Sequence, residues 1–395
     1  MTAEKVFDVA IAGGGIVGGA CAWACARRGL TVALVERDVL GSGATAAGMG
    51  HIVVLDDSEA QFALTRYAQQ LWQQMAPGLP GSAEYEQRGT LWIAADREEM
   101  EGAERKAAWY SERSVPCRLL TAAELSKEEP NLAPGFAGGL LMPEDAVVYP
   151  PTVALELARR AQELGASLFV GGAIKGLGQA CLVLEDGREV HANRIVLALG
   201  AESVQLRPDL PIRKRKGHLV ITDRHPGFVH HQLVELGYLK SAHNISGDSV
   251  AFNVQPRQTG QLLIGSSRQF EEHAAVDQRI LSSMLARAAL YLPGISRLSA
   301  IRVWTGFRAS TPDKLPLIGP DRTDPSLLLA TGHEGLGITT SVATGELIAD
   351  MLTDQPSAIA REPYLPARYT HTDRNQKNEE KHEVDWSHAG IDDGV

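Results

Sequence analysis

The chain has 395 residues, of which 44% are hydrophobic and 22% are charged. This composition excludes a disulfide-stapled mini-protein and a disordered or fibrous chain, and the length predicts two or three domains. There are 38 basic and 48 acidic residues, so the net charge of −10 argues against a nucleic-acid-binding protein. The one basic cluster, Arg213–Lys216, is too short to alter this expectation. No apolar run reaches the roughly 18–20 residues that a membrane helix needs.

The four cysteines form no motif that is typical of a metal or redox site. Cys21, Cys25, Cys117 and Cys181 include neither a Cys-x-x-Cys pair nor a His/Cys ligand cluster, and the first two lie in an apolar, helix-like stretch. We therefore expect buried thiols, no bound metal and a reducing compartment. Asp8 interrupts the early apolar run, so no signal peptide is expected. The predicted location is the cytoplasm, with peripheral contact to the inner face of the membrane left open.

The N-terminal segment predicts one strand–helix–strand unit. Phe7–Ala12 is a short apolar run that is followed at once by glycines, as in a buried parallel strand. An alanine-rich helix is predicted over Ile16–Arg28, ended by Gly29, and a second buried strand over Thr31–Val35. Three such elements within about 30 residues make a βαβ unit.

Downstream, helical spacing and short apolar runs alternate along the chain. The further helices predicted are 59–72, 96–113, 152–164 and 345–352. The further strands predicted are 89–94, 167–170, 194–199, 218–222, 249–254, 261–264 and 326–330. Between about 212 and 300 the strands are short and alternating, which favours an antiparallel sheet. From residue 369 the chain becomes polar and charged, as is typical of a loose tail.

The loop between the first strand and helix has the glycine spacing of a dinucleotide-binding turn. Residues 13–18 read Gly-Gly-Gly-Ile-Val-Gly, which is G-x-G-x-x-G. Gly13 permits the tight turn, Gly15 lets the backbone approach a pyrophosphate, and Gly18 lets helix and strand pack closely. The helix N-terminus at Ile16 and Val17 offers N–H groups and a partial positive charge to the anion.

Glu36 closes the second strand, where a carboxylate can accept hydrogen bonds from ribose hydroxyls. The same carboxylate would repel a 2′-phosphate, which argues against NADP. The loop that follows, 41–51, consists almost throughout of small residues and is long enough to line a flat ring system. Since an NAD dehydrogenase more often continues with another plain βαβ unit, this loop favours FAD over NAD.

At this loop the sequence resembles the D-amino-acid-oxidase-like (DAO) family of FAD enzymes, which includes glycine oxidase, sarcosine oxidase and D-hydroxyproline dehydrogenase. The resemblance runs from about residue 6 to 366. Its further anchors are the runs 197–201 (LALGA), 303–308 (VWTGFR), 311–313 (TPD), 315–320 (LPLIGP) and 332–339 (GHEGLGIT). It implies an α/β fold, α+β overall, in which an antiparallel-sheet substrate domain is inserted into a Rossmann-like FAD-binding domain.

The expected division of the chain is discontinuous. The FAD-binding domain is expected to comprise 1–85, 145–212 and 300–368. The substrate-binding domain is expected to comprise 86–144 and 213–299, and the polar tail 369–395.

Together with the glycine motif, the resemblance implies where FAD lies. The turn 333–339 leads into the last helix, and its N–H groups would face the flavin edge that gains negative charge on reduction. Sarcosine oxidases of the family tether FAD through a cysteine near the position of Arg308; no cysteine lies within 120 residues of it here, so FAD should be non-covalent. The expected FAD contacts are Gly13, Gly15, Ile16, Val17, Gly18, Glu36, Arg37, Ser42, Ala44, Thr45, Ala46, Ala47, Gly48, Met49, Ala173, Ile174, Ala198, Gly200, Gly306, His333, Glu334, Gly335, Leu336, Gly337, Ile338 and Thr339.

The resemblance also implies that Arg308 clamps the carboxylate of a substrate over the flavin. A guanidinium fork binds a carboxylate through two charge-assisted hydrogen bonds and so orients the α-carbon. Orientation matters because hydride transfer needs the C–H bond at a near-attack distance. A surface or interdomain ion pair is the alternative role for Arg308.

Four other positions are candidates for contact with the substrate. His51 and His333 could act as acid–base groups, although a structural role is the alternative for each and the family implies no obligatory side-chain base. Phe252 and Asn253 stand where glycine oxidase has a tyrosine that helps to hold the substrate. Because that tyrosine is missing, glycine is disfavoured, and an apolar Phe252 suits a ring-shaped secondary amine.

The sequence therefore predicts an FAD-dependent oxidoreductase that oxidises the C–N bond of a small D-amino or imino acid, with D-hydroxyproline as the best single candidate. Three alternatives stay open. They are a glycine or sarcosine oxidase that makes hydrogen peroxide, the FAD subunit of a heteromeric dehydrogenase of the hydrogen cyanide synthase or opine oxidase type, and a flavin-binding protein without turnover. The electron acceptor is expected to be oxygen, a partner redox protein or a quinone. Both homo- and hetero-oligomers are compatible with the sequence.

Overall fold

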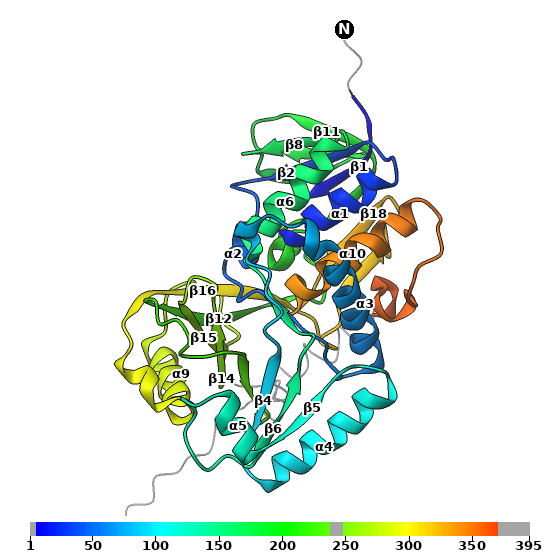
Figure 1. Cartoon of the computed structure of the whole chain (residues 1–395). Helices are drawn as coiled ribbons and strands as arrows, with labels where there is room; N and C mark the ends of the chain where they lie inside the picture. The colour runs from blue at the N-terminus through cyan, green and yellow to red at the C-terminus, as the bar shows by residue number, and fades with distance from the viewer. Residues whose placement is uncertain (1–4, 238–247, 370–395) are drawn as a thin grey trace, which may run out of the picture.

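The computed structural model describes residues 5–237 and 248–369, which are built around two large sheets. In Figure 1 the first sheet and its helices form the upper part of the molecule, and the second sheet with α9 and α4 forms the lower part. The predicted tail, apart from Tyr369, lies outside the described residues. Within the described ranges, no helix combines the length and apolarity that a membrane crossing needs.

The first sheet has the strand order β17-β18-β11-β1-β2-β8. All its neighbours along this path are parallel except β17 and β18. An antiparallel hairpin, β9–β10, extends from β11. The strand bounds are β1 (Phe7–Ala12), β2 (Val32–Glu36), β8 (Ser167–Val170), β9 (Ile174–Gly178), β10 (Cys181–Leu184), β11 (Glu189–Leu197), β17 (Leu317–Pro320) and β18 (Leu327–Thr331).

Helices cover one face of this sheet, and alternation along β1 shows why. Val9 and Ile11 point into the core that α1, α3, α6 and α10 share, while Ala10 and Ala12 point into a second core beneath the β9–β10 hairpin. Gly345 of α10 lies against α1, where a Cβ atom would be 2.6 Å from the carbonyl oxygen of Ala20. The helix bounds are α1 (Ile16–Arg27), α2 (Gly43–Ala46), α3 (Glu59–Met75), α6 (Pro150–Glu163), α7 (Ser203–Leu206) and α10 (Gly337–Leu352).

The second sheet has the order β16-β12-β15-β14-β13-β4-β6-β5. It is antiparallel apart from the parallel pair β13 and β4. The strand bounds are β4 (Thr90–Ala94), β5 (Arg118–Thr121), β6 (Gly138–Met142), β12 (Arg213–Thr222), β13 (Gln232–Glu235), β14 (Ser249–Pro256), β15 (Leu262–Arg268) and β16 (Ala300–Ser310). Within the described residues, it is accompanied by the helices α4 (Arg97–Glu112), α5 (Ala122–Glu128) and α9 (Gln278–Tyr291). A small separate ladder pairs β3 (His51–Ile52) with β7 (Ala146–Val147).

The predicted fold class is confirmed, and four details differ from expectation. Residues 300–310 were assigned to the FAD-binding domain, yet β16 pairs along its length with β12 and so belongs to the second sheet. The remaining domain bounds stay a prediction. The region 212–300, where an antiparallel sheet was expected, also contains the helix α9, which was not predicted. The closing helix begins at Gly337 rather than at Gly345, and the basic run 213–216 is a strand with Arg215 and Lys216 buried.

Candidate functional site

The glycine turn after β1 leaves no room for side chains. A Cβ atom on Gly18 would lie 1.8 Å from the carbonyl oxygen of Gly13, and one on Gly13 would lie 2.6 Å from that of Ala198. Gly13 also has a φ of 106°, which strains any residue with a Cβ atom. The backbone at the start of α1 is therefore bare, as a pyrophosphate cradle requires.

Glu36 is held at the end of β2 by the backbone around it. Its Oε2 accepts the Gly14 N–H at 2.7 Å, and its Oε1 accepts the Asp38 N–H at 2.8 Å. The Glu36 carbonyl accepts the Gly172 N–H at 3.0 Å, which brings the expected contacts Ala173 and Ile174 beside the same strand end. The carboxylate is thus fixed where a ribose is expected, whereas the neighbouring Arg37 is exposed.

The small-residue loop after β2 is wedged between three other elements. Thr45 Oγ1 accepts the Ile16 N–H at 3.0 Å, which ties α2 to the start of α1. A Cβ atom on Gly48 would meet Ile338 Cδ1 at 2.5 Å, and one on Gly306 would meet Ala47 Cβ at 2.4 Å. Met49 packs in a small apolar cluster with Leu219 and Leu263 of the second sheet. The loop therefore runs between the first helix, the turn before α10 and strand β16.

The turn before α10 is fastened to the strand that carries His51. Thr339 Oγ1 donates to the His51 carbonyl at 2.9 Å, and the Trp72 indole N–H donates to the Thr339 carbonyl at 2.8 Å. These bonds hold the N-terminus of α10 next to the loop that ends at Met49. The predicted neighbours of the flavin edge are therefore brought together.

Between this turn and one face of the second sheet lies a cavity. It is lined by His51, Val53, Leu55, Asp57, Gln61, Thr90, Trp92, Arg215, Gln232, Val234, Asn253, Arg268, Lys314, Glu334, Gly335 and Leu336. Several lining side chains have buried polar atoms without a hydrogen-bond partner in the described protein, which is unusual for a merely structural interior. They are His51, Gln61, Arg215, Gln232, Asn253 and Glu334. Such unmet groups in one concave space mark a site for a polar ligand.

His51 is the predicted acid–base candidate that this cavity contains. Its Nε2 is buried and has no hydrogen-bond partner among the described residues. Burial, with a smaller effect of Arg257, lowers the pKa of His51 to about 4. The imidazole is therefore neutral near pH 7, and it can accept or donate one hydrogen bond to a ligand without adding charge.

Arg308 lies beside the cavity on the face of the sheet that meets the small-residue loop. Along β16, Trp304, Gly306 and Arg308 share that face: Trp304 Nε1 donates to the Ala47 carbonyl at 3.4 Å, and Gly306 packs on Ala47. Arg308 Nη1 donates to the Ser267 carbonyl at 3.1 Å. Its Nε would be 3.5 Å from a Cβ atom on Gly335, a residue that lines the cavity, although Arg308 itself does not line it.

Two predicted substrate contacts lie elsewhere. Phe252 is fully buried in the core, where its ring stacks on Tyr291 with a centroid distance of 4.3 Å. Since neighbours on a strand point to opposite faces, only Asn253 reaches the cavity, and the expectation for Phe252 was wrong. The ring of His333 is buried and its Nε2 bonds Thr344 Oγ1 at 3.0 Å, so it braces the turn against α10 and the structure does not support its predicted catalytic role.

Sequence reasoning missed most of the basic lining of the cavity. Arg215, Arg268 and Lys314 come from β12, from the end of β15 and from the turn after β16. Glu334 and Lys314 both have a left-handed backbone, with φ of 49° and 62°, a conformation that non-glycine residues adopt rarely and often at functional sites. The basic run 213–216 gave a local signal, but it was interpreted as a short charged cluster.

One polar cluster contradicts the expectation drawn from the cysteines. Cys181, Glu189 and His191 converge across the β10–β11 ladder, with potential ligand atoms within 4.8 Å of one another. His191 Nε2 lies 3.1 Å from Glu189 Oε2. The sequence was expected to hold no His/Cys ligand cluster, and the spacing hid this one because a hairpin brings the three residues together.

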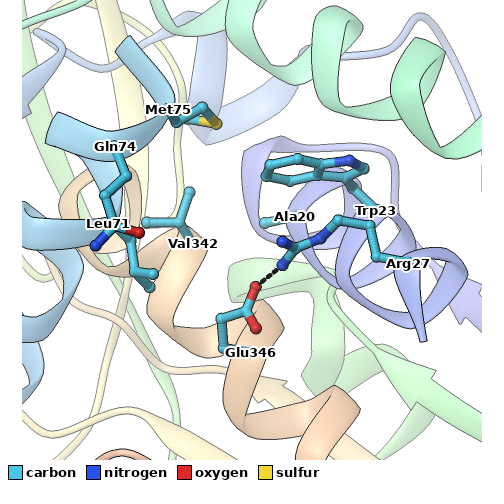
Figure 2. A pocket seen from close by; sticks show the side chains of 8 residues that line it. All are labelled: Ala20, Trp23, Arg27, Leu71, Gln74, Met75, Val342 and Glu346. Carbon is cyan, nitrogen blue, oxygen red and sulfur yellow. Dashed lines mark hydrogen bonds and ion pairs between the residues drawn. The ribbon is translucent and has the colours of Figure 1, made fainter. Parts of the chain in front are cut away.

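A second hollow lies between α1, α3 and α10 and has no relation to the predicted site. Figure 2 shows the Arg27 guanidinium paired with Glu346 at its edge, beside the ring of Trp23. It is lined by Ala20, Trp23, Arg27, Leu71, Gln74, Met75, Val342 and Glu346. None of these residues is among the expected cofactor or substrate contacts, so we assign no function to it.

Comparison with known proteins decides between the cofactor families. The family model described as "DAO: FAD dependent oxidoreductase" matches residues 8–351. The chain belongs to the DAO family. The resemblance stated from the motifs, and FAD as the cofactor, are thereby confirmed.

Relatives of this DAO family member include glycine oxidase from Geobacillus kaustophilus, which is 27% identical over 92% of this chain and 97% of its own. The hydrogen cyanide synthase subunit HcnC of Pseudomonas aeruginosa is 25% identical over 93% of this chain and 97% of its own. The crystal structure of the Geobacillus glycine oxidase superposes with a TM-score of 0.83, covering 93% of this chain and 100% of that one at 26% identity. The L-proline dehydrogenase structure from P. horikoshii shares the fold, with a TM-score of 0.84 at 23% identity, over 94% and 99% of the two chains.

The residues present in this DAO family member fit FAD. The bare turn at Gly13 and Gly18 would take the pyrophosphate, Glu36 the ribose, and the loop that ends at Met49 the ring system. When bound, FAD supplies the acceptor for the electron pair that amine oxidation releases. Beside this cradle, the chain supplies the buried imidazole of His51 in the cavity wall, which is neutral near pH 7 because burial lowers its pKa to about 4.

Proposed function

We propose that the protein oxidises the C–N bond of a small D-amino or imino acid by hydride transfer to FAD. The observation that supports this most is the position of Arg308. It shares a sheet face with Gly306, which packs on the loop expected to line the flavin, and it lies next to Gly335 of the cavity wall. A guanidinium there can hold a carboxylate while the α-carbon faces the flavin.

The cavity wall supports a small polar substrate. Asn253 and Gln232 each have a buried oxygen without a hydrogen-bond partner among the described residues, and His51 adds a neutral nitrogen. An amine that enters can donate to these acceptors while its carboxylate meets Arg308. Burial lowers the pKa of His51 to about 4, which prevents the imidazole from repelling a cationic amine near neutral pH.

D-hydroxyproline is the first substrate to test, but the structure removes one of the arguments for it. The argument for a ring-shaped amine used Phe252, which lies in the core rather than in the cavity. The relatives of this chain include the glycine oxidases of Geobacillus kaustophilus and Pseudomonas aeruginosa. A glycine or sarcosine oxidase that makes hydrogen peroxide is therefore the second candidate. The relation to a hydrogen cyanide synthase subunit keeps the FAD subunit of a heteromeric dehydrogenase as the third.

An anaerobic screen tests the proposal. Purified FAD-loaded protein is mixed with D- and L-proline, cis- and trans-hydroxyprolines, glycine and sarcosine, and bleaching of the flavin absorption is followed. Reduction by at least one of these amines is the expected result. If no amino or imino acid bleaches the flavin, the protein is a flavin-binding protein without this turnover. Oxygen uptake compared with dye reduction then separates an oxidase from a dehydrogenase.

A further inference from the structure

Basic side chains outnumber acidic ones in the wall of the candidate substrate cavity. Arg215, Arg268 and Lys314 line it, against Asp57 and Glu334. His51 adds no charge near pH 7, because burial lowers its pKa to about 4. An excess of one sign of charge in a cavity wall attracts ligands of the opposite sign, and the excess here is one positive charge. The chain as a whole has a net charge of −10, so this local excess runs against its average.

Arg215 carries the argument because it is deeply buried and incompletely bonded. It is 4% exposed, and its Nη1 donates to Glu334 Oε1 at 3.1 Å. Its Nε and Nη2 are buried and have no hydrogen-bond partner within the described part of the chain. Leaving buried N–H groups unmet is costly, and Nε with Nη2 forms the edge of a guanidinium that matches a carboxylate.

The register of the second sheet sets a second guanidinium beside the first. Arg215 on β12 and Arg308 on β16 are directly opposite each other in the antiparallel ladder, so both side chains leave the same face. Like charges directly opposite each other destabilise a sheet, and Glu334 forms an ion pair with Arg215 on one side of this pair. Two anionic groups on one ligand would relieve it.

We propose that the substrate is an amino or imino acid with a second carboxylate, which Arg215 binds while Arg268 and Lys314 contribute positive potential. This rests on the proposed function, in which Arg308 holds the carboxylate next to the reacting carbon. Dicarboxylic amines are therefore preferred over amines with one carboxylate. D-hydroxyproline, whose second polar group is an uncharged hydroxyl, is a weaker ligand than a dicarboxylate of similar size.

The decisive measurement is binding of a matched pair of ligands that cannot be oxidised as amines. Thiodiacetate and (methylthio)acetate differ by one carboxylate, and calorimetry with FAD-loaded protein gives both affinities. We expect thiodiacetate to bind at least about tenfold more tightly, with a preference that shrinks as salt is raised. Equal affinities for the two ligands would overturn the proposal.

A variant then assigns the effect to Arg215. The double variant Arg215→Met, Glu334→Gln removes the buried pair together, so that no carboxylate is left without its partner. It should lose at least about tenfold in affinity for thiodiacetate, against less than about threefold for (methylthio)acetate. The matched control Arg97→Met removes a charge on α4, where the side chain is 93% exposed, and should change neither affinity. Should the double variant fail to fold, Arg268→Met changes the same cavity wall. It should also weaken the binding of thiodiacetate more than that of (methylthio)acetate.

Anaerobic flavin reduction by iminodiacetate and sarcosine separates this inference from the proposed function. Faster reduction by iminodiacetate at low concentration supports both. If sarcosine reduces the flavin as well as iminodiacetate does, the second-carboxylate site is wrong and the amine oxidoreductase stands. If neither amine reduces the flavin but thiodiacetate binding depends on Arg215, the site stands and the proposed reaction fails.

Discussion

Gly18 and Gly13 approach each other so closely that a Cβ atom on Gly18 would lie 1.8 Å from the Gly13 carbonyl oxygen. The contact joins the first turn of α1 to the strand before it, and it fixes the path of the backbone that receives the pyrophosphate. The variant Gly18→Ala should therefore lose FAD and unfold at lower denaturant concentration than the wild type. Flavin content after purification and urea unfolding measure this. The control Gly176→Ala places a methyl group where no atom lies within 4 Å and should keep its flavin. Normal flavin content in the Gly18→Ala variant would contradict the packing argument.

Removing the guanidinium of Arg308 should weaken substrate binding and leave FAD binding unchanged. Charge-assisted hydrogen bonds contribute about 1.5–3 kcal/mol each, so Arg308→Met should lower kcat/KM by about 10- to 100-fold. FAD content should stay normal. The exposed Arg302 on the same strand provides the matched control, Arg302→Met. Unchanged substrate affinity in the Arg308 variant would show that another group holds the carboxylate.

The variant Glu36→Gln should weaken FAD binding by about tenfold. The amide keeps only one oxygen for the Gly14 and Asp38 N–H groups, and it loses the charge that strengthens both hydrogen bonds. Titration of the apoprotein with FAD, followed by flavin fluorescence, gives the dissociation constants. Glu163→Gln, at a 61% exposed side chain on α6, makes the same chemical change away from the cradle. Equal FAD affinity in both variants would remove Glu36 from the cofactor site.

Asp145 should make the fold less stable as pH rises. Burial raises the pKa of this carboxyl to about 7, above its unfolded value of 3.8, so the folded protein binds the extra proton between these pH values. Its stabilising contribution is present at low pH and is lost as pH rises through 7. Asp145→Asn should thus gain stability relative to wild type by at most about 1.4 kcal/mol per pH unit between about pH 4 and pH 7, with no further gain above 7. Urea unfolding at pH 5 and pH 8 measures this gain, with Asp38→Asn at an exposed position as control. If the free energies of unfolding of Asp145→Asn and wild type differ by the same amount at both pH values, the prediction is wrong.

Phe252 and Asn253 should respond in opposite ways to substitution. Phe252→Leu disturbs the stack on Tyr291 and should lower the free energy of unfolding by about 1–2 kcal/mol without altering substrate KM. Asn253→Ala should change KM and leave stability nearly unaffected, since its Oδ1 has no partner among the described residues. Unfolding curves and steady-state kinetics of the two variants test this. A changed substrate preference in Phe252→Leu would contradict the assignment of Phe252 to the core.

The first domain could be predicted well because its signals are local. Apolar β-branched runs that end in glycines give β1 and β2 almost to the residue, and the close approach of Gly18 to Gly13 requires the glycine spacing that the sequence shows. The period of an amphipathic helix likewise gave α3 and α6. In each case, residues adjacent in sequence determine the structure.

The substrate cavity could not be predicted in the same way because its wall is assembled by pairing between distant strands. Arg215 and Arg308 are far apart in sequence and meet only through the register of β12 with β16. Alternation along β14 shows that Phe252 and Asn253 face opposite ways, but nothing local tells which of them faces the ligand. Likewise, the pairing of a hairpin, which the sequence does not predict, forms the cluster of Cys181, Glu189 and His191.

Strand β16 also limits how reactants enter and leave. It is hydrogen-bonded to β12 from one end to the other, its Ala309 carbonyl accepts the Glu334 N–H, and Gly306 presses on Ala47. A hinged opening between the part built on the first sheet and the part built on the second would have to break the contacts of β16 with Glu334 and Ala47. We therefore expect the amine to enter and the product to leave through the opening of the cavity, while these two parts of the molecule stay in contact.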